Sequence, residues 1–116
     1  MIDVSHANSS KQHARQITVA ADVAAQIAAG EHRITGIMIE SHLFEGRQDI
    51  VPGQPLLPGV SVTDACISFE QTVPVLQGLE MTARTVRNTV IRDALTRVRA
   101  TPAACGRKLP TVEQKE

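Results

Sequence analysis

The chain has 116 residues, which is enough for one small domain. Aromatic residues make up only 2% of it, with neither Trp nor Tyr, so any core must be built from aliphatic side chains. The formal net charge is +0, which argues against a protein that binds nucleic acid or another polyanion over its whole surface. Residues 1–79 carry 4 basic and 8 acidic side chains, whereas residues 80–116 carry 8 basic and 4 acidic ones, so a −4 body precedes a +4 tail.

The two cysteines, Cys66 and Cys105, form no C-x-x-C pair and are typical of ordinary reduced thiols. The N-terminus has no charged region followed by an apolar leader, and no apolar run approaches membrane-spanning length. We therefore expect a cytoplasmic protein with no membrane partner.

The apolar residues at the start predict a short strand over residues 1–5. Ser9 and Gln12 form an S-x-x-Q pattern, which predicts a capping box at the start of a helix over roughly residues 10–29. The apolar side chains of this helix recur at three- and four-residue steps, at Ile17, Ala20, Ala21, Ala24, Ile27 and Ala28. Gly30 stands where a left-handed residue ends a helix.

The next segment, "RITGIMIES", predicts a second strand over residues 34–40. Its apolar run is nearly continuous, which is typical of a parallel strand buried on both faces. A strand, a helix and a strand at this spacing predict a βαβ unit. The two strands should be parallel neighbours with a right-handed crossover.

Residues 41–62 contain three Gly and three Pro and predict a long irregular loop. Thr63 then offers a cap for a short helical turn. A longer helix is expected from Thr72 to about Arg99, with Pro74 in its first turn. Its apolar stripe comprises Leu76, Leu79, Ala83, Val86, Val90, Ala94 and Val98. The remaining residues, up to 116, have too little apolar content to fold alone.

His6, Glu40 and Asp64 occupy the positions where a parallel α/β protein holds its ligands. His6 ends the first strand, Glu40 ends the second, and Asp64 lies beyond the loop that leaves the second strand. One imidazole and two carboxylates suit a borderline divalent ion such as Mn²⁺, Fe²⁺ or Zn²⁺. No local pattern such as H-E-x-x-H fixes their geometry, so on spacing alone ordinary solvated loop residues are the simpler interpretation.

Three further features have two interpretations each. His42 follows Glu40 by two residues, so it is either a group that orients a ligand or a plain surface histidine. The Ser-Ser-Lys run at residues 9–11 suits phosphate at a helix N-terminus, although capping explains its serines without any ligand. Cys66 is better explained as a small core residue than as a nucleophile, because no base stands in position beside it.

Three stretches carry a family resemblance: "MIDVSHANSSKQ", "DVAAQIAAGEHRITGIMIESHLFEG" and "GVSVTDACISFEQT". Together they resemble the C-terminal part of type I 3-deoxy-D-arabino-heptulosonate 7-phosphate (DAHP) synthase, a metal-dependent (β/α)₈ enzyme. The resemblance covers roughly residues 1–79. It implies an α/β fold, the C-terminal βαβα portion of a (β/α)₈ TIM barrel, followed by a divergent, helical and partly disordered tail over residues 80–116.

The resemblance also implies a transferase. This family condenses phosphoenolpyruvate with erythrose 4-phosphate to give DAHP and phosphate, the first step of the shikimate pathway to aromatic amino acids. The family's metal-binding residues fall on His6, Glu40 and Asp64, and His6 is the expected catalytic residue. The implied cofactor is a divalent ion of the Mn, Fe, Co or Zn class, which polarises the aldehyde. The intact enzyme is expected to be a homo-oligomer.

The chain also departs from the family pattern. Met1 matches a residue inside the seventh barrel strand, so we expect only the last two βα units here. The family's fourth metal ligand, a Cys from an early strand, is matched by neither Cys66 nor Cys105, and the Arg and Lys residues that hold the substrates are missing. We therefore expect the chain alone to be inactive. Residues 80–116 resemble nothing known to us, and their Arg residues indicate a solvated helix face more than a surface for an acidic partner.

Two alternatives remain open at this point. One is a related enzyme that condenses phosphoenolpyruvate, such as the synthase of 3-deoxy-octulosonate 8-phosphate. The other is a non-catalytic piece of a barrel that acts only by associating through its open strand edges.

Overall fold

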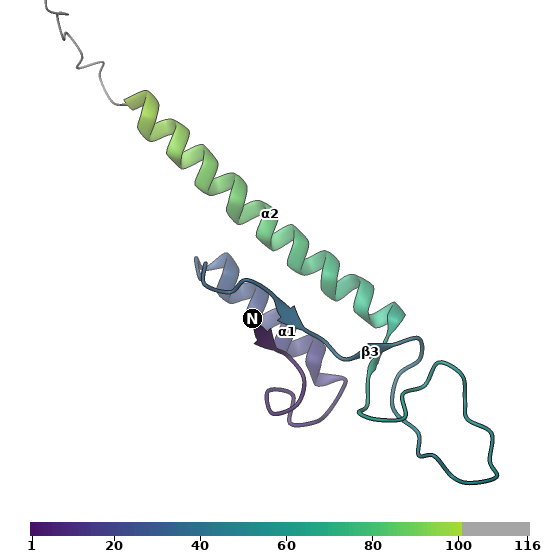
Figure 1. Ribbon diagram of the computed structural model, residues 1–116. Helices are drawn as coiled ribbons and strands as arrows, with labels where there is room; N and C mark the ends of the chain where they lie inside the picture. Colours follow the sequence, from purple (N-terminus) through teal and green to yellow (C-terminus); the bar gives the residue numbers. More distant parts are fainter. Residues whose placement is uncertain (101–116) are drawn as a thin grey trace, which may run out of the picture.

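The structure is a computed structural model that describes residues 1–100, with side chains through residue 97. Its elements along the chain are β1 (Ile2–Asp3), α1 (Arg15–Ala28), β2 (Ile37–Met38), β3 (Ser41–His42), β4 (Ile67–Ser68) and α2 (Phe69–Ala100). Figure 1 shows α2 running beside α1 and continuing well past its end. The predicted tail beyond residue 100, with Cys105, lies outside the described residues.

The first sheet has the predicted parallel pairing. Strand β1 pairs with β2, with Ile2 opposite Ile37 and Asp3 opposite Met38. The main-chain N–H of Val4 also donates to the Met38 carbonyl over 3.0 Å, which extends the pairing toward the carboxyl ends of the strands. The prediction that these strands are parallel neighbours is confirmed.

The second sheet joins β3 to β4, again in parallel, with Ser41 opposite Ile67. Only Ile39 and Glu40 separate β2 from β3. One extended segment therefore contacts β1 through its first half and β4 through its second half. Glu40 lies at the junction, where the Ile67 N–H donates to its carbonyl oxygen over 3.0 Å.

The core lies between the first sheet and the helices. Val4, Ala20 and Val23 are buried, and half-buried apolar side chains surround them: Ile2, Val19, Ile27, Ile34, Ile37, Ile39 and Val75. The prediction that the second strand is buried on both faces is wrong for the described residues, since both residues of β2 are only half-buried. Within residues 1–97 Ile37 packs against this core and Met38 does not, because α1 covers one face of the sheet only.

Helix α1 begins later than predicted, at Arg15, and no described side chain caps it. The Ser9 hydroxyl instead donates to the His6 carbonyl over 3.2 Å, so the capping box predicted at Ser9 is wrong. The chain turns tightly between β1 and α1, and this turn takes up the residues expected in the first helical turn. Positive φ angles mark it, 44° at His6, 54° at Ser10 and 58° at Lys11.

The predicted end of the first helix is confirmed. Gly30 has a φ of 105°. Its N–H donates to the Ile27 carbonyl over 3.0 Å, and the Glu31 N–H donates to the Gln26 carbonyl over 3.0 Å. This pair of hydrogen bonds is the Schellman arrangement, which needs a left-handed residue and therefore favours glycine.

A capping box does occur, at the start of α2. The Gln71 N–H donates to the Ser68 hydroxyl over 3.2 Å, and the Ser68 N–H donates to the Gln71 side-chain carbonyl over 2.8 Å. The helix thus begins at Phe69, three residues before the predicted Thr72. The prediction had placed Pro74 within the first turn of this helix. Because the helix begins earlier, Pro74 lies beyond that turn.

The short helical turn predicted after Thr63 is also wrong. Residues 61–66 are irregular and are held by main-chain contacts to the preceding loop. The N–H groups of Gly46 and Cys66 each donate to the carbonyl of the other residue, over 2.8 Å and 3.1 Å. These long-range bonds lead the chain directly into β4.

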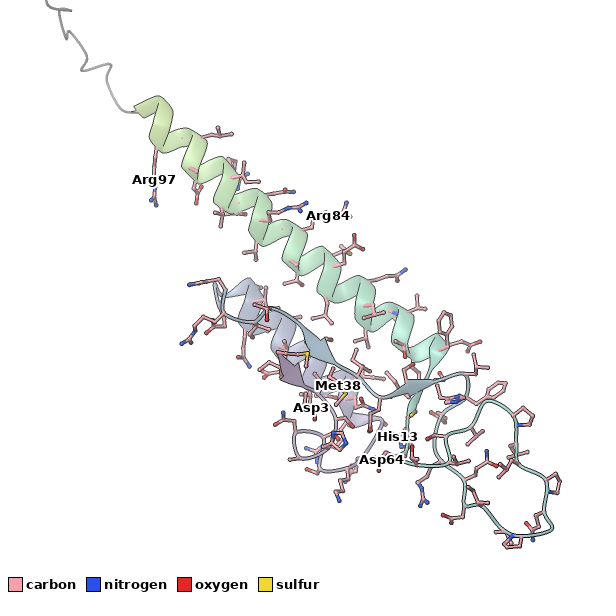
Figure 2. All side chains as sticks on the ribbon, viewed as in Figure 1. Asp3, His13, Met38, Asp64, Arg84 and Arg97 are labelled. Carbon is pink, nitrogen blue, oxygen red and sulfur yellow. The ribbon has the colours of Figure 1, made fainter. Side chains whose placement is uncertain are left out.

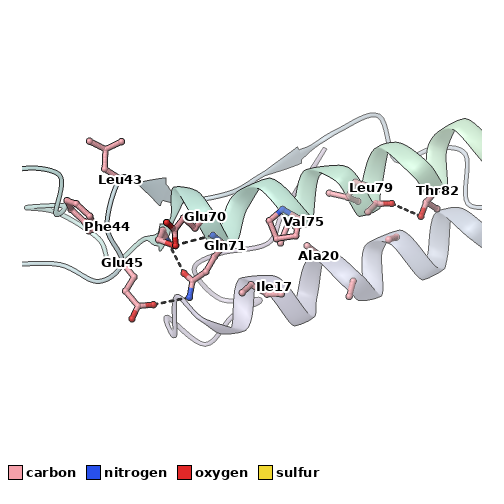
Figure 3. Close-up of a pocket in the computed structure, with 15 residues that line it drawn as sticks. Ile17, Ala20, Leu43, Phe44, Glu45, Glu70, Gln71, Val75, Leu79 and Thr82 are labelled. Carbon is pink, nitrogen blue, oxygen red and sulfur yellow. Dashed lines mark hydrogen bonds between the residues drawn. The ribbon is translucent and has the colours of Figure 1, made fainter.

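Helices α1 and α2 run in the same direction (Figure 1) and, with residues 43–45, line a groove with a volume of about 970 Å³. Figure 3 shows Ile17 and Ala20 of α1 facing Val75 and Leu79 of α2, with a hydrogen bond between Glu45 and Gln71 at one end. Beyond α1, two described residues of the predicted apolar stripe, Val90 and Ala94, are exposed, and Val90 is 63% accessible. In the described part of the chain, neither helix has an apolar stretch long enough to cross a membrane.

Candidate metal centre

His6 follows β1 in a conformation that is uncommon for a residue with a side chain. Its φ is 44°, in the left-handed region. Its carbonyl oxygen accepts two hydrogen bonds, from the Lys11 N–H over 2.7 Å and from the Ser9 hydroxyl over 3.2 Å. These contacts hold the turn that brings the imidazole to the carboxyl end of the sheet.

The main chain at Glu40 is held by a buried side chain of α1. Gln16, which is 1% exposed, accepts a hydrogen bond from the Glu40 N–H over 2.8 Å and donates one to the Glu40 carbonyl over 3.1 Å. The carboxylate of Glu40 is held separately, since its Oε2 accepts a hydrogen bond from the Ser5 hydroxyl over 2.5 Å. Its second oxygen, Oε1, faces His6.

Asp64 comes from the irregular segment before β4 and has an exposed side chain. Its carbonyl oxygen lies 3.5 Å from the Cys66 sulfur. Figure 2 shows Asp64 near the end of the sheet that carries Asp3. The bridge between Gly46 and Cys66 fixes this segment, so the position of Asp64 depends on the fold of the long loop.

The three predicted ligands converge. The Nε2 atom of His6 lies 3.4 Å from Oε1 of Glu40 and 3.9 Å from Oδ2 of Asp64. One ligand atom from each residue lies within 4.8 Å of the other two. The structure therefore gathers, at one point, side chains that are separated by 34 and 24 positions in the sequence, from 6 to 40 and from 40 to 64.

The surrounding carboxylates favour a cation at this point. The pKa of His6 is raised above its ordinary value of 6.5, chiefly because its ring donates a hydrogen bond to Asp3, with further contributions from the charges of Asp3, Glu40 and Asp64. A group of three carboxylates around one imidazole concentrates negative potential. The same potential that stabilises an imidazolium stabilises a bound metal ion.

The donor set and its spacing fit a divalent ion. Ligand atoms that each lie about 2.1 Å from one ion, at a tetrahedral angle, are about 3.4 Å apart. The separation of His6 and Glu40 has this value, and that of Asp64 from His6 is slightly longer. One neutral imidazole nitrogen and two carboxylates suit ions of the Mn, Fe, Co or Zn class.

Two other singled-out residues lie outside this group. His42 is exposed, and its Nδ1 accepts a hydrogen bond from the Leu43 N–H over 2.8 Å, so it is a surface histidine. Cys66 is buried, and burial raises the pKa of its thiol above the ordinary 9.0. Both observations agree with a core residue.

Sequence reasoning missed the groups that support the ligands, namely Asp3, Ser5 and Gln16. A signal for Gln16 was present, because it shares a helix face with the core residues Ala20 and Val23, four and seven positions later. A polar side chain in an apolar stripe indicates a buried hydrogen-bonding role.

Comparison with protein families matches residues 1–77 to the DAHP synthetase I family. The chain belongs to this family. Among relatives, the chain is 57% identical over 79 residues to the Phe-sensitive phospho-2-dehydro-3-deoxyheptonate aldolase of Escherichia coli (strain K12). This match covers 68% of this chain and 23% of the relative. It is 53% identical over 91 residues to the tyrosine-inhibited enzyme of that name from Schizosaccharomyces pombe (strain 972 / ATCC 24843), covering 75% and 24%.

A solved structure from this group also matches the fold. Phospho-2-dehydro-3-deoxyheptonate aldolase from Francisella tularensis SCHU S4 superposes with a TM-score of 0.67 at 46% identity, over 72% of this chain and 24% of that one. This DAHP synthase-like chain thus spans about a quarter of the length of the relatives it matches.

Proposed function

We propose that residues 1–79 are the C-terminal βαβα portion of a (β/α)₈ DAHP synthase barrel and carry three of its metal ligands. On this proposal His6, Glu40 and Asp64 bind one divalent ion for the 3-deoxy-7-phosphoheptulonate synthase reaction. The observation that supports it is the meeting of these three side chains within 4.8 Å in a chain of this family. On this proposal the sequence from residue 80 onward diverges from the family, although α2 runs without interruption from Phe69 to Ala100 across this boundary.

The reaction joins phosphoenolpyruvate to erythrose 4-phosphate, consumes one water molecule and releases phosphate. The bound ion supplies Lewis acidity toward the aldehyde oxygen of the sugar phosphate. The chain supplies the geometry: the Nε2 lone pair of His6 and one oxygen each from Glu40 and Asp64. The two carboxylates balance the charge of a divalent ion, and the Ser5 hydroxyl holds Glu40 in one orientation.

Titration of the full chain with Mn²⁺ tests the metal centre directly. Free Mn²⁺ is measured by electron paramagnetic resonance, since the bound ion loses its six-line spectrum. We expect one tight site in the wild type and at least a tenfold loss of affinity in His6→Ala, Glu40→Gln and Asp64→Asn. The matched control is Asp22→Asn, because Asp22 is an exposed carboxylate on α1 that accepts a hydrogen bond from the Gln26 side chain. Equal binding by wild type and the three site variants would contradict the proposal.

Activity is tested separately, by consumption of phosphoenolpyruvate in the presence of erythrose 4-phosphate and Mn²⁺. The chain alone is expected to give no turnover, because it lacks the Arg and Lys residues that hold the substrates in this family. Positioning of both substrates lowers the barrier by on the order of 7–11 kcal/mol in reactions of this kind. Turnover that is lost in His6→Ala would overturn this expectation. Homo-oligomerisation of the intact enzyme and a cytoplasmic location stay predictions.

The alternative of a piece that acts by association has one observation in its favour. Within residues 1–100 each sheet contains two strands, so each leaves main-chain donors and acceptors at its outer edges. Sedimentation velocity separates the two proposals. An assembly that forms equally well in Glu40→Gln, with no metal bound, supports association alone.

A further inference from the structure

Asp3 lies beside His6 and is held by contacts of both its main chain and its carboxylate. It lies in β1, opposite Met38 of β2, so its main chain is part of the first sheet (Figure 2). Its carbonyl oxygen accepts a hydrogen bond from the Asn8 side chain over 2.6 Å. The Oδ1 atom of its carboxylate accepts the N–H of Ser5 over 2.8 Å.

These contacts leave one carboxylate oxygen, Oδ2, directed at the histidine. It lies 2.8 Å from the Nδ1 atom of His6. An ionised carboxylate is only an acceptor, so the proton of this hydrogen bond must be on Nδ1. The neutral ring then has its lone pair on Nε2, and Nε2 is the atom that faces Glu40 and Asp64.

The two ring nitrogens of histidine have distinct roles, and the partner of one decides what the other can bind. Histidines that bind metals commonly donate their other N–H to a carboxylate, which fixes the tautomer and the ring orientation. The strained turn at His6 makes such a restraint more important here, because a free imidazole on an exposed loop samples several rotamers.

We propose that Asp3 is a positioning residue, which holds His6 in the Nδ1–H tautomer and directs Nε2 at the point shared by Glu40 and Asp64. It acts through His6 and does not itself touch the ion. The inference rests on the proposed metal centre for its purpose, although the tautomer and ring orientation are properties of the chain without metal.

The first test is the tautomer of His6 in the metal-free chain, read from ¹⁵N chemical shifts and two-bond couplings. Because the pKa of His6 is raised above the ordinary 6.5, the tautomer is read on the alkaline plateau of its own titration, where the ring is neutral. We expect the Nδ1–H form in the wild type and a shift toward the Nε2–H form in Asp3→Ala. Asp3→Asn, which keeps a neutral acceptor of the same shape, should be intermediate. Asp22→Ala is the matched control and should match the wild type.

The second test uses Co²⁺ alone as the probe, with visible absorption to report its ligand geometry. We expect Asp3→Ala to weaken binding by about 10–100-fold and to alter the absorption bands, because removal of a partner of a ligating histidine has effects of this size. Asp22→Ala should bind Co²⁺ as the wild type does. Amide spectra of each variant check that the first sheet is retained. If Asp3→Ala loses this sheet, the role of Asp3 is judged from the tautomer of His6 in the wild type alone.

The results separate this inference from the function on which it rests. A wild type that binds no Co²⁺ contradicts the metal centre, whereas the tautomer measurement still decides the role of Asp3. An Nε2–H tautomer in the wild type overturns the inference. So does an Asp3→Ala variant that keeps both the tautomer and the Co²⁺ affinity of the wild type.

Discussion

Gln16 and Glu40 are joined through both main-chain groups of Glu40, although 24 positions separate them in the sequence. The amide of Gln16 accepts from the N–H and donates to the C=O, as a neighbouring strand would. Helix α1 is thereby connected to the carboxyl end of the extended segment that carries a proposed metal ligand. The connection is almost entirely buried, since Gln16 is 1% exposed.

We therefore expect Gln16→Leu to destabilise the chain strongly. Leucine has a similar volume, but it leaves the main-chain groups of Glu40 without this partner. A buried group that loses its hydrogen bond costs about 1–3 kcal/mol. Urea denaturation followed by circular dichroism measures the change in the free energy of unfolding. Gln26→Leu is the matched control on the exposed face of α1, and a similar loss in both variants would contradict the role given to Gln16.

Gly30 and Gly78 should respond to alanine in opposite directions. A Cβ atom at either position meets nothing within 4 Å, so steric clash is not the cause. Gly30 has a φ of 105°, and alanine there should cost roughly 1 kcal/mol or more. Gly78 lies inside α2, where alanine should add about 0.5–1 kcal/mol to stability. Thermal unfolding of the two variants measures both signs, and equal shifts would refute the assignment of Gly30 as the helix terminator.

Ser68→Ala should weaken the start of α2. It removes the hydroxyl that accepts the Gln71 N–H, and loss of such a cap typically costs about 0.5–2 kcal/mol. Ser10→Ala is the control, since Ser10 is exposed and caps no helix. Chemical denaturation measures both changes. A loss of stability in Ser10→Ala as large as that in Ser68→Ala would contradict the capping role given to Ser68.

The titration of His6 should be displaced upward. The hydrogen bond to Asp3, followed by the charges of Asp3, Glu40 and Asp64, raises the pKa of His6 above 6.5 in the metal-free chain. The protonated ring is thus favoured by the folded state. Its contribution to stability is fully present below pH 6.5 and is lost as the pH rises through the folded-state pKa.

Imidazole proton shifts followed against pH measure this value, and Asp3→Asn should move it back toward 6.5. Asp22→Asn removes an equal charge elsewhere and should leave the midpoint nearly unchanged, because exposed charges at a distance are screened. A His6 midpoint at or below 6.5 in the wild type would contradict the arrangement of carboxylates around the ring.

The sequence by itself determined the features that depend on near neighbours along the chain. The apolar runs at residues 1–5 and 34–40 predicted a parallel pair, and Gly30 predicted the end of the first helix, because a left-handed residue is a local requirement. The family stretches pointed to His6, Glu40 and Asp64. The strand order of the second sheet had no such signal, since β3 and β4 each contain only two residues.

The tertiary structure alone decided which of two equal local patterns is used. The S-x-x-Q pattern occurs at Ser9 and at Ser68, and only Ser68 caps a helix. At Ser9 the chain must turn so that His6 reaches carboxylates from residues 40 and 64, and the hydroxyl is used to hold that turn. Likewise the partner of Gln16 lies 24 residues away. Hydrogen bonds between distant segments outweigh a local capping preference worth about 1 kcal/mol, and no local pattern identifies their partners.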